Sequence, residues 1–349
     1  MSATKSSPVQ FLPLGAIIQS IVVGGYNVVL GFESQDDYTS IDHPYFGETI
    51  GRIPNRLSDG LIRGLNGRNY TMSKNERGIT TLHGGPNGWG KKLWQGPETF
   101  VDGLKLVNLF TLRSPDGDEG FPGELEARVK YIVEKRVSSY DGCTRGTEEV
   151  ILDIEYEVEM IGKEGDITET VCAMTNHSYW NLSGGSTVSG TAVTLFSDQY
   201  LEVDANQIPT GRVLEYPGKK AYTTVEYSDQ GPVIDDCFIL DANVSSVPLD
   251  TRSRPLRRYA SLYHPVTKLH LEAETTEPSF QFYTGDGINV VQGSGANCSG
   301  IKRYGPRSGM ALEPNRYVNA VNRPEWRHLV LLKKGERWGC RNRFTVWLE

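Results

Sequence analysis

The sequence has few of the residues that build covalent or metal-stabilised folds. Only five cysteines occur among 349 residues, and no C-x-x-C pair is present. A disulfide framework and a structural zinc site are therefore not expected. The chain also lacks H-x-x-x-H and H-E-x-x-H metal motifs, a G-x-S-x-G nucleophile elbow and a complete Walker A loop. These absences argue against metallohydrolases, α/β-type serine hydrolases and P-loop nucleotide enzymes.

Positive charge and long apolar runs are also scarce. Lys and Arg number 36 against 43 Asp and Glu, which gives a formal net charge of −7. No nucleic-acid partner is expected, because binding to phosphates favours a basic surface. Four arginines between residues 252 and 258 are the one basic cluster, which we interpret as a solvated loop. The apolar stretch at 11–23 is interrupted by proline, glycine and polar residues, so it predicts strand, turn and strand rather than a signal peptide or membrane span.

Potential glycosylation sequences bear on the cellular compartment. N-x-S/T occurs at Asn69, Asn176, Asn181, Asn243 and Asn297. Two of these asparagines flank His177, which is a candidate catalytic residue for reasons given below. A glycan at either position would obstruct that site, so the sequence favours a cytoplasmic protein.

Alternation of apolar and polar residues dominates the chain. The segments 125–133, 153–160 and 269–274 each place apolar residues at every second position, as do 104–112 and 343–348 less regularly. This period of two is typical of a strand with one buried face and one wet face. No stretch of 12 or more residues has a convincing helical period, and only short helices or turns are expected, near Glu48 and Tyr317.

Many glycine-containing turns separate these predicted strands. Such a pattern, without helical crossovers, predicts an all-β fold built from a large antiparallel sheet system. We find no linker and no internal repeat, so residues 1–349 are expected to form a single domain. The polar segment Val137 to Glu149 is interpreted as a long hairpin loop. The oligomeric state stays open between monomer and homodimer.

Two of the six histidines stand out by their surroundings. His83 directly precedes Gly84 and Gly85, which allow a tight turn and close approach of a ligand. His177 lies in a segment where, on a strand, it would share one face with Tyr179 and Asn181. Such a histidine can also be a buried structural residue, and the local sequence does not decide between the two roles. The other four histidines, at 43, 264, 270 and 328, are predicted to lie on the surface.

Four further polar residues are candidates for a site. Glu313 follows an apolar triplet, which predicts a partly buried carboxylate at a strand end, able to act as a base near neutral pH. Arg56 offers a planar fork of donors for hydroxyl groups. Asp235 precedes Asp236 and an apolar run, and Gln281 lies between aromatic residues on a predicted strand. A buried amide of this kind needs hydrogen-bond partners, which a sugar can supply.

Seven segments, taken in order, resemble the aldose 1-epimerase (galactose mutarotase) family over nearly the whole chain. They are GRIPNRLSDG at 51–60, TLHGGPNGWGKKLW at 81–94, SPDGDEGFPG at 114–123, TNHSYWNLSGG at 175–185, IDDCF at 234–238, PSFQFYTGD at 278–286 and ALEPNRYVNAVNRP at 311–324. The resemblance implies a β-sandwich of the galactose mutarotase type, sometimes called a supersandwich. It also implies interconversion of the α and β anomers of a free aldohexose, with no cofactor and no metal.

The resemblance implies roles for individual residues. His177 matches the general acid that protonates the ring oxygen, and Glu313 matches the general base that takes the proton of the anomeric hydroxyl. His83 matches a second histidine, which supports the sugar near the ring oxygen. The family's sugar-binding residues match Arg56, Asp235 and Gln281. Departures from the family pattern at Pro54, Trp180 and Asp286 are expected to reshape the rim of the pocket and so affect the preferred aldose.

Three other functions are weighed against this one. A hexose-6-phosphate epimerase would need arginines converging on a phosphate, for which the candidates are Arg52, Arg63, Arg68 and Arg77. A non-catalytic carbohydrate-binding protein would be favoured if either proton-transfer residue were missing, and both are present. A glycosidase would use two carboxylates across the scissile bond, whereas here the second group is a histidine.

Overall fold

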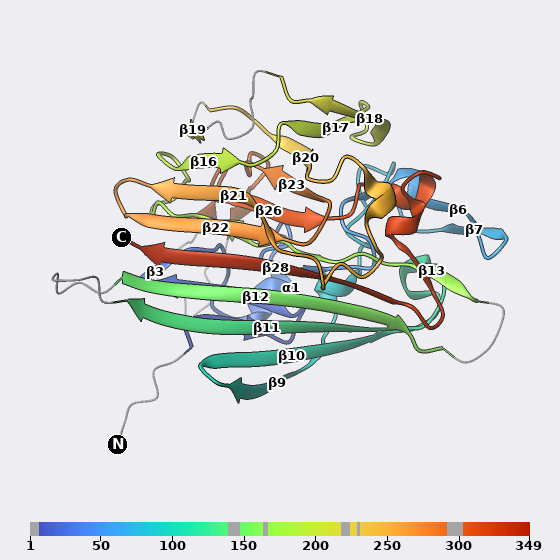
Figure 1. The fold of residues 1–349 in the computed structure, drawn as a ribbon, viewed down its shortest axis with the longest axis horizontal. Helices are drawn as coiled ribbons and strands as arrows, with labels where there is room; N and C mark the ends of the chain where they lie inside the picture. Colours follow the sequence, from blue (N-terminus) through green and yellow to red (C-terminus); the bar gives the residue numbers. More distant parts are fainter. Residues whose placement is uncertain (1–6, 139–146, 163–166, 218–223, 229–230, 292–302) are drawn as a thin grey trace.

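The computed structural model describes residues 7–138, 147–162, 167–217, 224–228, 231–291 and 303–349. Strands dominate this part of the chain, and all their pairings within named sheets are antiparallel, as predicted (Figure 1). The largest sheet has nine strands, in the order β19 (Thr224–Glu226), β16 (Ala192–Leu195), β21 (Arg257–His264), β22 (Leu269–Thr275), β28 (Arg337–Leu348), β12 (Thr147–Met160), β11 (Leu125–Ser138), β10 (Lys105–Ser114) and β9 (Gln95–Asp102).

The alternating segments form the centre of this sheet. In β11 every second side chain from Leu125 to Val133 is buried, and the side chains between them are partly exposed. The same alternation holds along β22, where Leu269, Leu271 and Ala273 are buried. Burial of one face supplies the hydrophobic driving force, and the other face carries charged residues in contact with water. The strands predicted from the period of two are confirmed.

A second sheet of six strands packs against the first. Its order is β15 (Tyr179–Trp180), β26 (Met310–Asn315), β23 (Ser279–Tyr283), β20 (Asp235–Ile239), β17 (Gln199–Val203) and β18 (Pro209–Glu215). Aromatic rings join the two sheets: Tyr259 of β21 lies 4.6 Å from Phe280 of β23, and Trp180 of β15 lies 4.7 Å from Phe344 of β28, between ring centroids. Two antiparallel sheets sharing a core define a β-sandwich, which is the predicted fold class.

Short strands and helical turns complete the described chain. The small sheets are β1 (Val9–Leu12), β2 (Ile17–Val23) and β3 (Tyr26–Asn27); β4 (Thr49–Ile50) with β14 (Thr175–Asn176); β5 (Arg56–Leu57) with β8 (Thr81–Leu82); β6 (Leu61–Leu65) with β7 (Arg68–Thr71); β13 (Glu169–Val171) with β27 (Leu331–Lys333); and β24 (Val290–Val291) with β25 (Arg303–Tyr304). The helical elements are α1 (Gln35–Ser40) and 3₁₀ turns at Ser58–Gly60, Trp89–Lys91, Asp118–Gly120, Val244–Ser246, Ala320–Asn322 and Arg327–Leu329. None of the helices in the described ranges is long and apolar enough to cross a membrane.

The predicted hairpin loop at Val137 to Glu149 is shorter than expected. Strand β11 continues to Ser138, β12 begins at Thr147, and the two stay in register to that pair. Residues 139–146, between them, lie outside the described residues. The polar composition was misleading because the outer face of this sheet is itself polar, so the strand ends resemble a loop in sequence.

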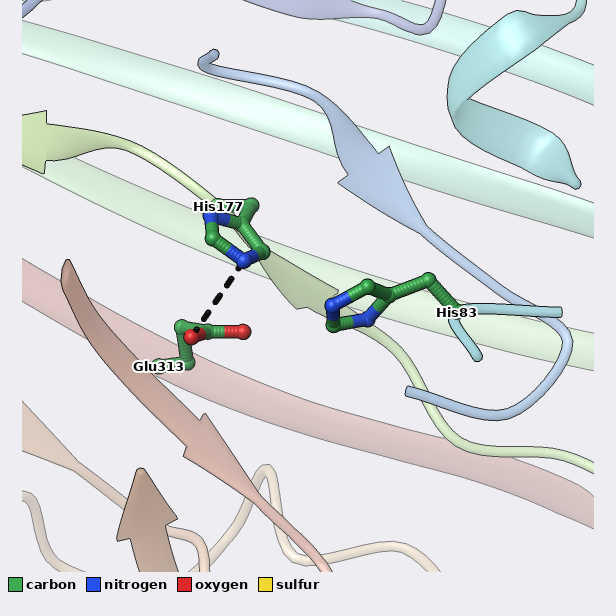
Figure 2. Close-up of side chains that lie close together, drawn as sticks. All are labelled: His83, His177 and Glu313. Carbon is green, nitrogen blue, oxygen red and sulfur yellow. Dashed lines mark ion pairs between the residues drawn. The ribbon is translucent and has the colours of Figure 1, made fainter. Parts of the chain in front are cut away.

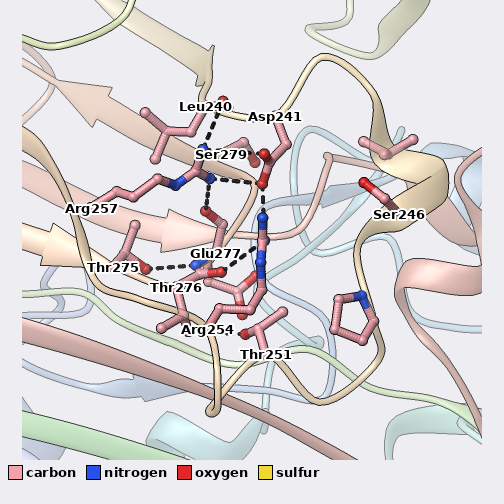
Figure 3. A network of polar contacts seen from close by, with 12 residues as sticks. Leu240, Asp241, Ser246, Thr251, Arg254, Arg257, Thr275, Thr276, Glu277 and Ser279 are labelled. Atoms are coloured by element: carbon pink, nitrogen blue, oxygen red, sulfur yellow. Dashed lines mark hydrogen bonds and ion pairs between the residues drawn. The ribbon is translucent and has the colours of Figure 1, made fainter.

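The interpretation of the four arginines as a solvated loop is correct only for Arg252 and Arg254, which lie partly exposed in the turn before β21. Arg257 and Arg258 begin strand β21, and each of the four arginines is paired with a carboxylate. Figure 3 shows Arg254 and Arg257 converging on Asp241, at 2.9 and 2.7 Å. Apart from Asp250, which pairs with the neighbouring Arg252, the acidic partners lie further away in the sequence. The segment therefore looks basic in sequence, whereas its charges are paired in the structure.

Two histidines predicted on the surface, His43 and His264, are buried instead. One nitrogen of the His43 ring contacts the carbonyl of Tyr38, and the other accepts the N–H of Phe46. The ring of His264 contacts the Thr267 hydroxyl in the turn that follows its strand. Turn contacts satisfy both ring nitrogens of His43, whereas the second nitrogen of His264 contacts the carbonyl of Ser189, far away in the sequence, at 3.3 Å. With both nitrogens of each ring partnered, burial costs little. His328 is exposed and His270 is partly exposed, as predicted.

Candidate active site

One face of the six-stranded sheet carries three of the predicted site residues. Glu313 of β26 lies directly opposite Gln281 of β23. Asp235 of β20 lies opposite Tyr283, two residues further along β23. Since side chains of paired and alternate residues share a face, these groups project to one side while Phe280, Phe282 and Leu312 enter the core. Glu313 lies within its strand rather than at the end of it, and it is fully buried instead of partly buried.

The opposite wall is built from loops and short strands. Arg56 in β5 pairs with Leu82 in β8, so His83 follows directly beside it. His83, Asn55 and Tyr45 all have positive φ values, of 50°, 56° and 61°. Residues other than glycine rarely adopt this conformation, and such strain is concentrated at functional sites. The fold therefore holds these three side chains in place against their local preference.

His177 lies in an irregular link between two short strands. It follows β14 (Thr175–Asn176) and precedes β15 (Tyr179–Trp180), and its backbone exchanges hydrogen bonds with Gly47 and Glu48 at 3.0 and 2.9 Å. The predicted common face is partly correct. His177 and Tyr179 meet with ring centroids 5.0 Å apart. Asn181 is not part of the site, because its amide donates to the carbonyls of Gly185 and Ser308.

These elements enclose a cavity of about 180 Å³, large enough for one small ligand. All six predicted site residues line it. The complete lining is Pro44, Tyr45, Asn55, Arg56, Leu82, His83, His177, Tyr179, Asp235, Gln281, Tyr283 and Glu313. Planar hydrogen-bonding groups beside aromatic rings suit a ligand with both hydroxyl groups and apolar faces. Asp235 is the lining residue of the acidic pair, since Asp236 accepts a hydrogen bond from Tyr216 instead.

The carboxylate and the imidazole at the centre of the cavity lie close together. Glu313 Oε1 is 3.5 Å from His177 Nε2, and both side chains are almost entirely buried (Figure 2). Burial raises the pKa of Glu313 to about 8; nearby Asp235 adds to this rise and Arg56 opposes it. Burial lowers the pKa of His177 to about 3, and the positive charge of Lys91 also lowers it. Between these two values the pair holds one proton, which belongs to the pair rather than to either residue.

His83 completes the group as a hydrogen-bond donor. Its Nδ1 accepts the backbone N–H of Asn55 at 3.2 Å. Burial holds the pKa of His83 well below its usual value, so the ring is neutral. A neutral imidazole that accepts at Nδ1 carries its proton on Nε2. The Nε2–H group of His83 can therefore donate a hydrogen bond to a ligand oxygen. A neutral donor of this kind is better suited to holding the ligand than to transferring a proton.

Among the described residues, the same three side chains form a group that could hold a metal ion. Their ligand atoms lie within 4.8 Å of one another, and two imidazoles with one carboxylate form a donor set that Zn²⁺ and Fe²⁺ accept (Figure 2). No metal and no cofactor are predicted from the sequence, and an activity assay in the presence of a chelator tests this prediction.

Some lining residues were not among the predicted site residues. Asn55 directly precedes Arg56 in the segment GRIPNRLSDG at 51–60, and this neighbouring position could have indicated that Asn55 lines the site. Tyr283 lies in the quoted segment 278–286, two residues after Gln281 on the same strand face, and this was the available signal; Tyr45 carries no distinctive local pattern. The three departures from the family pattern, at Pro54, Trp180 and Asp286, are not among the residues that line the cavity, so the expectation that they reshape its rim is not supported. Trp180 packs on Phe344 in the core, and Asp286 pairs with Arg307.

The fold and the cavity define a β-sandwich protein equipped for acid–base chemistry on a small polar ligand. Comparison with known proteins identifies its family: the aldose 1-epimerase model matches residues 1–345, and the chain belongs to that family. It is 33% identical over 325 residues to galactose mutarotase of Homo sapiens, covering 93% of this chain and 83% of that protein. It is also 35% identical over 339 residues to the bifunctional protein gal10 of Schizosaccharomyces pombe, covering 96% of this chain.

Some relatives are much longer than this chain, whereas solved structures of similar length share its fold. The chain spans less than half of the bifunctional relatives, 43% of the Schizosaccharomyces pombe protein and 44% of its counterpart in Pachysolen tannophilus. A GalM/aldose epimerase homologue from C. elegans superposes with a TM-score of 0.75 at 23% identity, covering 97% of this chain and 94% of that one. Galactose 1-epimerase from Lactobacillus acidophilus superposes with a TM-score of 0.70 at 22% identity, covering 99% and 92%. These similarities show the galactose mutarotase fold.

Proposed function

We propose that the protein is an aldose 1-epimerase that interconverts the α and β anomers of free aldohexoses such as glucose and galactose. The observation that carries the proposal is the buried pair of Glu313 and His177, 3.5 Å apart in a cavity for one small ligand. Two further features support it. Arg56, Asp235 and Gln281 line the same cavity, and relatives of similar sequence are named galactose mutarotases.

The proposed reaction needs only proton transfers. Glu313 removes the proton of the anomeric hydroxyl, whose electron pair forms the carbonyl as the C1–O5 bond breaks. His177 delivers its proton to O5, so the ring opens without net change in charge. Rotation of the aldehyde about C1–C2 and the reverse transfers give the other anomer. Each proton-transfer group contributes about 10²- to 10⁴-fold in rate.

The active form of the pair is its ion pair, with the proton on His177 and none on Glu313. Burial by itself favours the neutral form, because it disfavours both charges. Hydroxyl groups of a bound sugar can hydrogen-bond the carboxylate and so favour the ion pair. The two forms hold the same number of protons, so their ratio does not depend on pH.

Polarimetry tests the proposed function directly. We expect the protein to accelerate the mutarotation of freshly dissolved α-D-glucose and α-D-galactose, and the acceleration to persist in EDTA. Loss of activity in EDTA with recovery on adding Zn²⁺ would assign the His83, His177 and Glu313 group to a metal instead.

Inhibition by glucose 6-phosphate far exceeding that by glucose would favour a phosphosugar substrate. The structure gives little support for the latter, since none of Arg52, Arg63, Arg68 and Arg77 lines this cavity.

A pH profile tests the shared proton. We expect kcat/KM to be bell-shaped, falling on the acidic side as the pair gains a second proton near pH 3. The rate should fall as the pH rises through about 8, because the pair then loses the proton that His177 must deliver. A rate that rises through pH 8 would mean that Glu313 acts beside a neutral His177 with another acid. A flat profile from roughly pH 5 to 9 would count against the pair altogether.

We also propose that the chain acts in the cytoplasm as a single domain. The single domain is supported by a large hydrophobic cluster, which runs from Val9 to Val346 and includes residues of both large sheets, with a second, smaller cluster in the same part of the chain, from Leu14 to Ala311. The cytoplasmic location is supported by Asn176 and Asn181, whose N-x-S sequences flank His177 and whose side chains are buried. Glycans attached to these asparagines before folding would be incompatible with this packing.

A further inference from the structure

A carboxylate outside the cavity holds the guanidinium that lines it. Glu76 accepts hydrogen bonds from Arg56 Nε at 3.1 and 3.0 Å, and from Nη2 at 2.9 Å. Both side chains are mostly buried, with 12% of Arg56 and 15% of Glu76 exposed. A bidentate pair of this kind fixes both the position and the plane of an arginine. Glu76 itself is not a lining residue of the cavity.

The segment that carries Glu76 is tied to the same ribbon as Arg56. Backbone hydrogen bonds between Glu76 and Thr80 close a tight loop, and the Thr80 hydroxyl donates to the Glu76 carboxylate. The side chain of Asn75 exchanges two hydrogen bonds with the backbone of Leu82, which is the strand partner of Arg56. Burial alone would raise the pKa of Glu76, but the hydrogen bonds from Arg56 and Thr80 hold it below its usual value. The carboxylate is therefore ionised and locked in place.

On the side away from Glu76, the guanidinium of Arg56 faces the carboxylate of Asp235. Nη2 of Arg56 is 3.8 Å from Oδ2 of Asp235, too far for a direct hydrogen bond. Asp235 in turn accepts a hydrogen bond from Gln281 at 2.7 Å. A hydroxyl group placed between Arg56 and Asp235 can accept from one and donate to the other. If Arg56 turned away from Glu76, it would be free to close this gap and pair directly with Asp235.

We infer that Glu76 is a positioning residue for sugar binding, which holds Arg56 away from Asp235 and so keeps a hydroxyl subsite open between them. The inference rests on the proposed function, because it concerns the same cavity. Glu76 touches neither the sugar nor the proton-transfer pair. Its effect should therefore appear in the affinity for the aldose and not in the chemical step.

The test compares Glu76→Gln with wild type in steady-state mutarotation of D-galactose. Glutamine keeps the size of the side chain but loses its charge and one of its acceptor oxygens. We expect KM to rise about tenfold, the usual effect of losing a hydrogen bond to a charged group, and kcat to stay within about twofold. Glu76→Asp, which keeps the charge, should restore part of the affinity. Glu98→Gln, on the exposed edge strand β9, is the matched control and should behave as wild type.

A double-mutant cycle separates positioning from a general structural role. In an Arg56→Ala background, Glu76→Gln should change KM by less than about twofold, because Glu76 acts only through that arginine. Additive losses, or a Glu76→Gln variant with the kinetics of wild type, would overturn the inference. If Glu76→Gln does not fold, as judged by thermal unfolding, the same cycle is run with Glu76→Asp. Absence of mutarotation by wild type would instead remove the proposed function.

Discussion

Replacing Glu313 by glutamine should lower the rate of mutarotation by about 10²- to 10⁴-fold. Glutamine has nearly the same shape and can still hydrogen-bond a hydroxyl group, but it cannot accept the anomeric proton. Glu313 lies opposite Gln281 on a sheet face where an uncharged amide is already accommodated. The loss should therefore fall on kcat, with a smaller change in KM. Polarimetry at saturating sugar measures this directly.

Although the Glu313→Gln variant should lose activity, its folded state should be at least as stable as that of wild type near pH 8. Burial raises the pKa of Glu313 from 4.5 to about 8. As the pH rises between these values, the unfolded chain loses its proton while the folded chain keeps it, so the folded state is progressively penalised. Glutamine removes this penalty. At pH 8 the variant should unfold at a temperature no lower than wild type. An inactive variant that is also strongly destabilised would leave the loss attributable to misfolding, and one that is active would exclude Glu313 as the base.

Replacing His177 by asparagine should cause a loss of similar size, about 10²- to 10⁴-fold in kcat. Asparagine cannot carry the proton that the ring oxygen must receive. The residual rate of the variant should rise rather than fall through pH 8, because Glu313 then titrates without a partner and only its deprotonated form can act as the base. His177 is held between two short strands through its own backbone, so replacing the side chain leaves these hydrogen bonds in place.

His83→Asn is the matched comparison for His177→Asn. His83 is bound through Nδ1 to the Asn55 backbone and offers only a neutral N–H, so its loss should weaken binding more than chemistry. We expect a change in KM that exceeds the change in kcat. If His83→Asn abolished turnover while His177→Asn kept it, the two histidines would have exchanged roles.

Much of the fold was predictable because its signal is local. The alternation in β11, β12 and β22 reports which face is buried, and this needs no knowledge of strand order. Predictions of surface exposure were less accurate, because exposure depends on packing by other parts of the chain. His43 and His264 are predicted on the surface because their neighbours are polar, yet both are buried, and the ring of His264 contacts the distant carbonyl of Ser189. The basic cluster at 252–258 was assigned to solvent, yet acidic partners such as Asp241 and Glu272 neutralise it.

The sequence by itself determined the residue types at the site and the period of the strands that carry them. The sequence motifs alone point to residues 56, 83, 177, 235, 281 and 313. Only the tertiary structure brought them to one cavity, because strand register places Gln281 opposite Glu313 and the strained loops at Tyr45, Asn55 and His83 close the other side. The pKa values also depend on it, since burial of a carboxylate or an imidazole arises from packing by distant segments and has no local pattern. For the same reason no local pattern indicates a role for Glu76, seven residues before His83; only its hydrogen bonds to Arg56 in the folded structure do so.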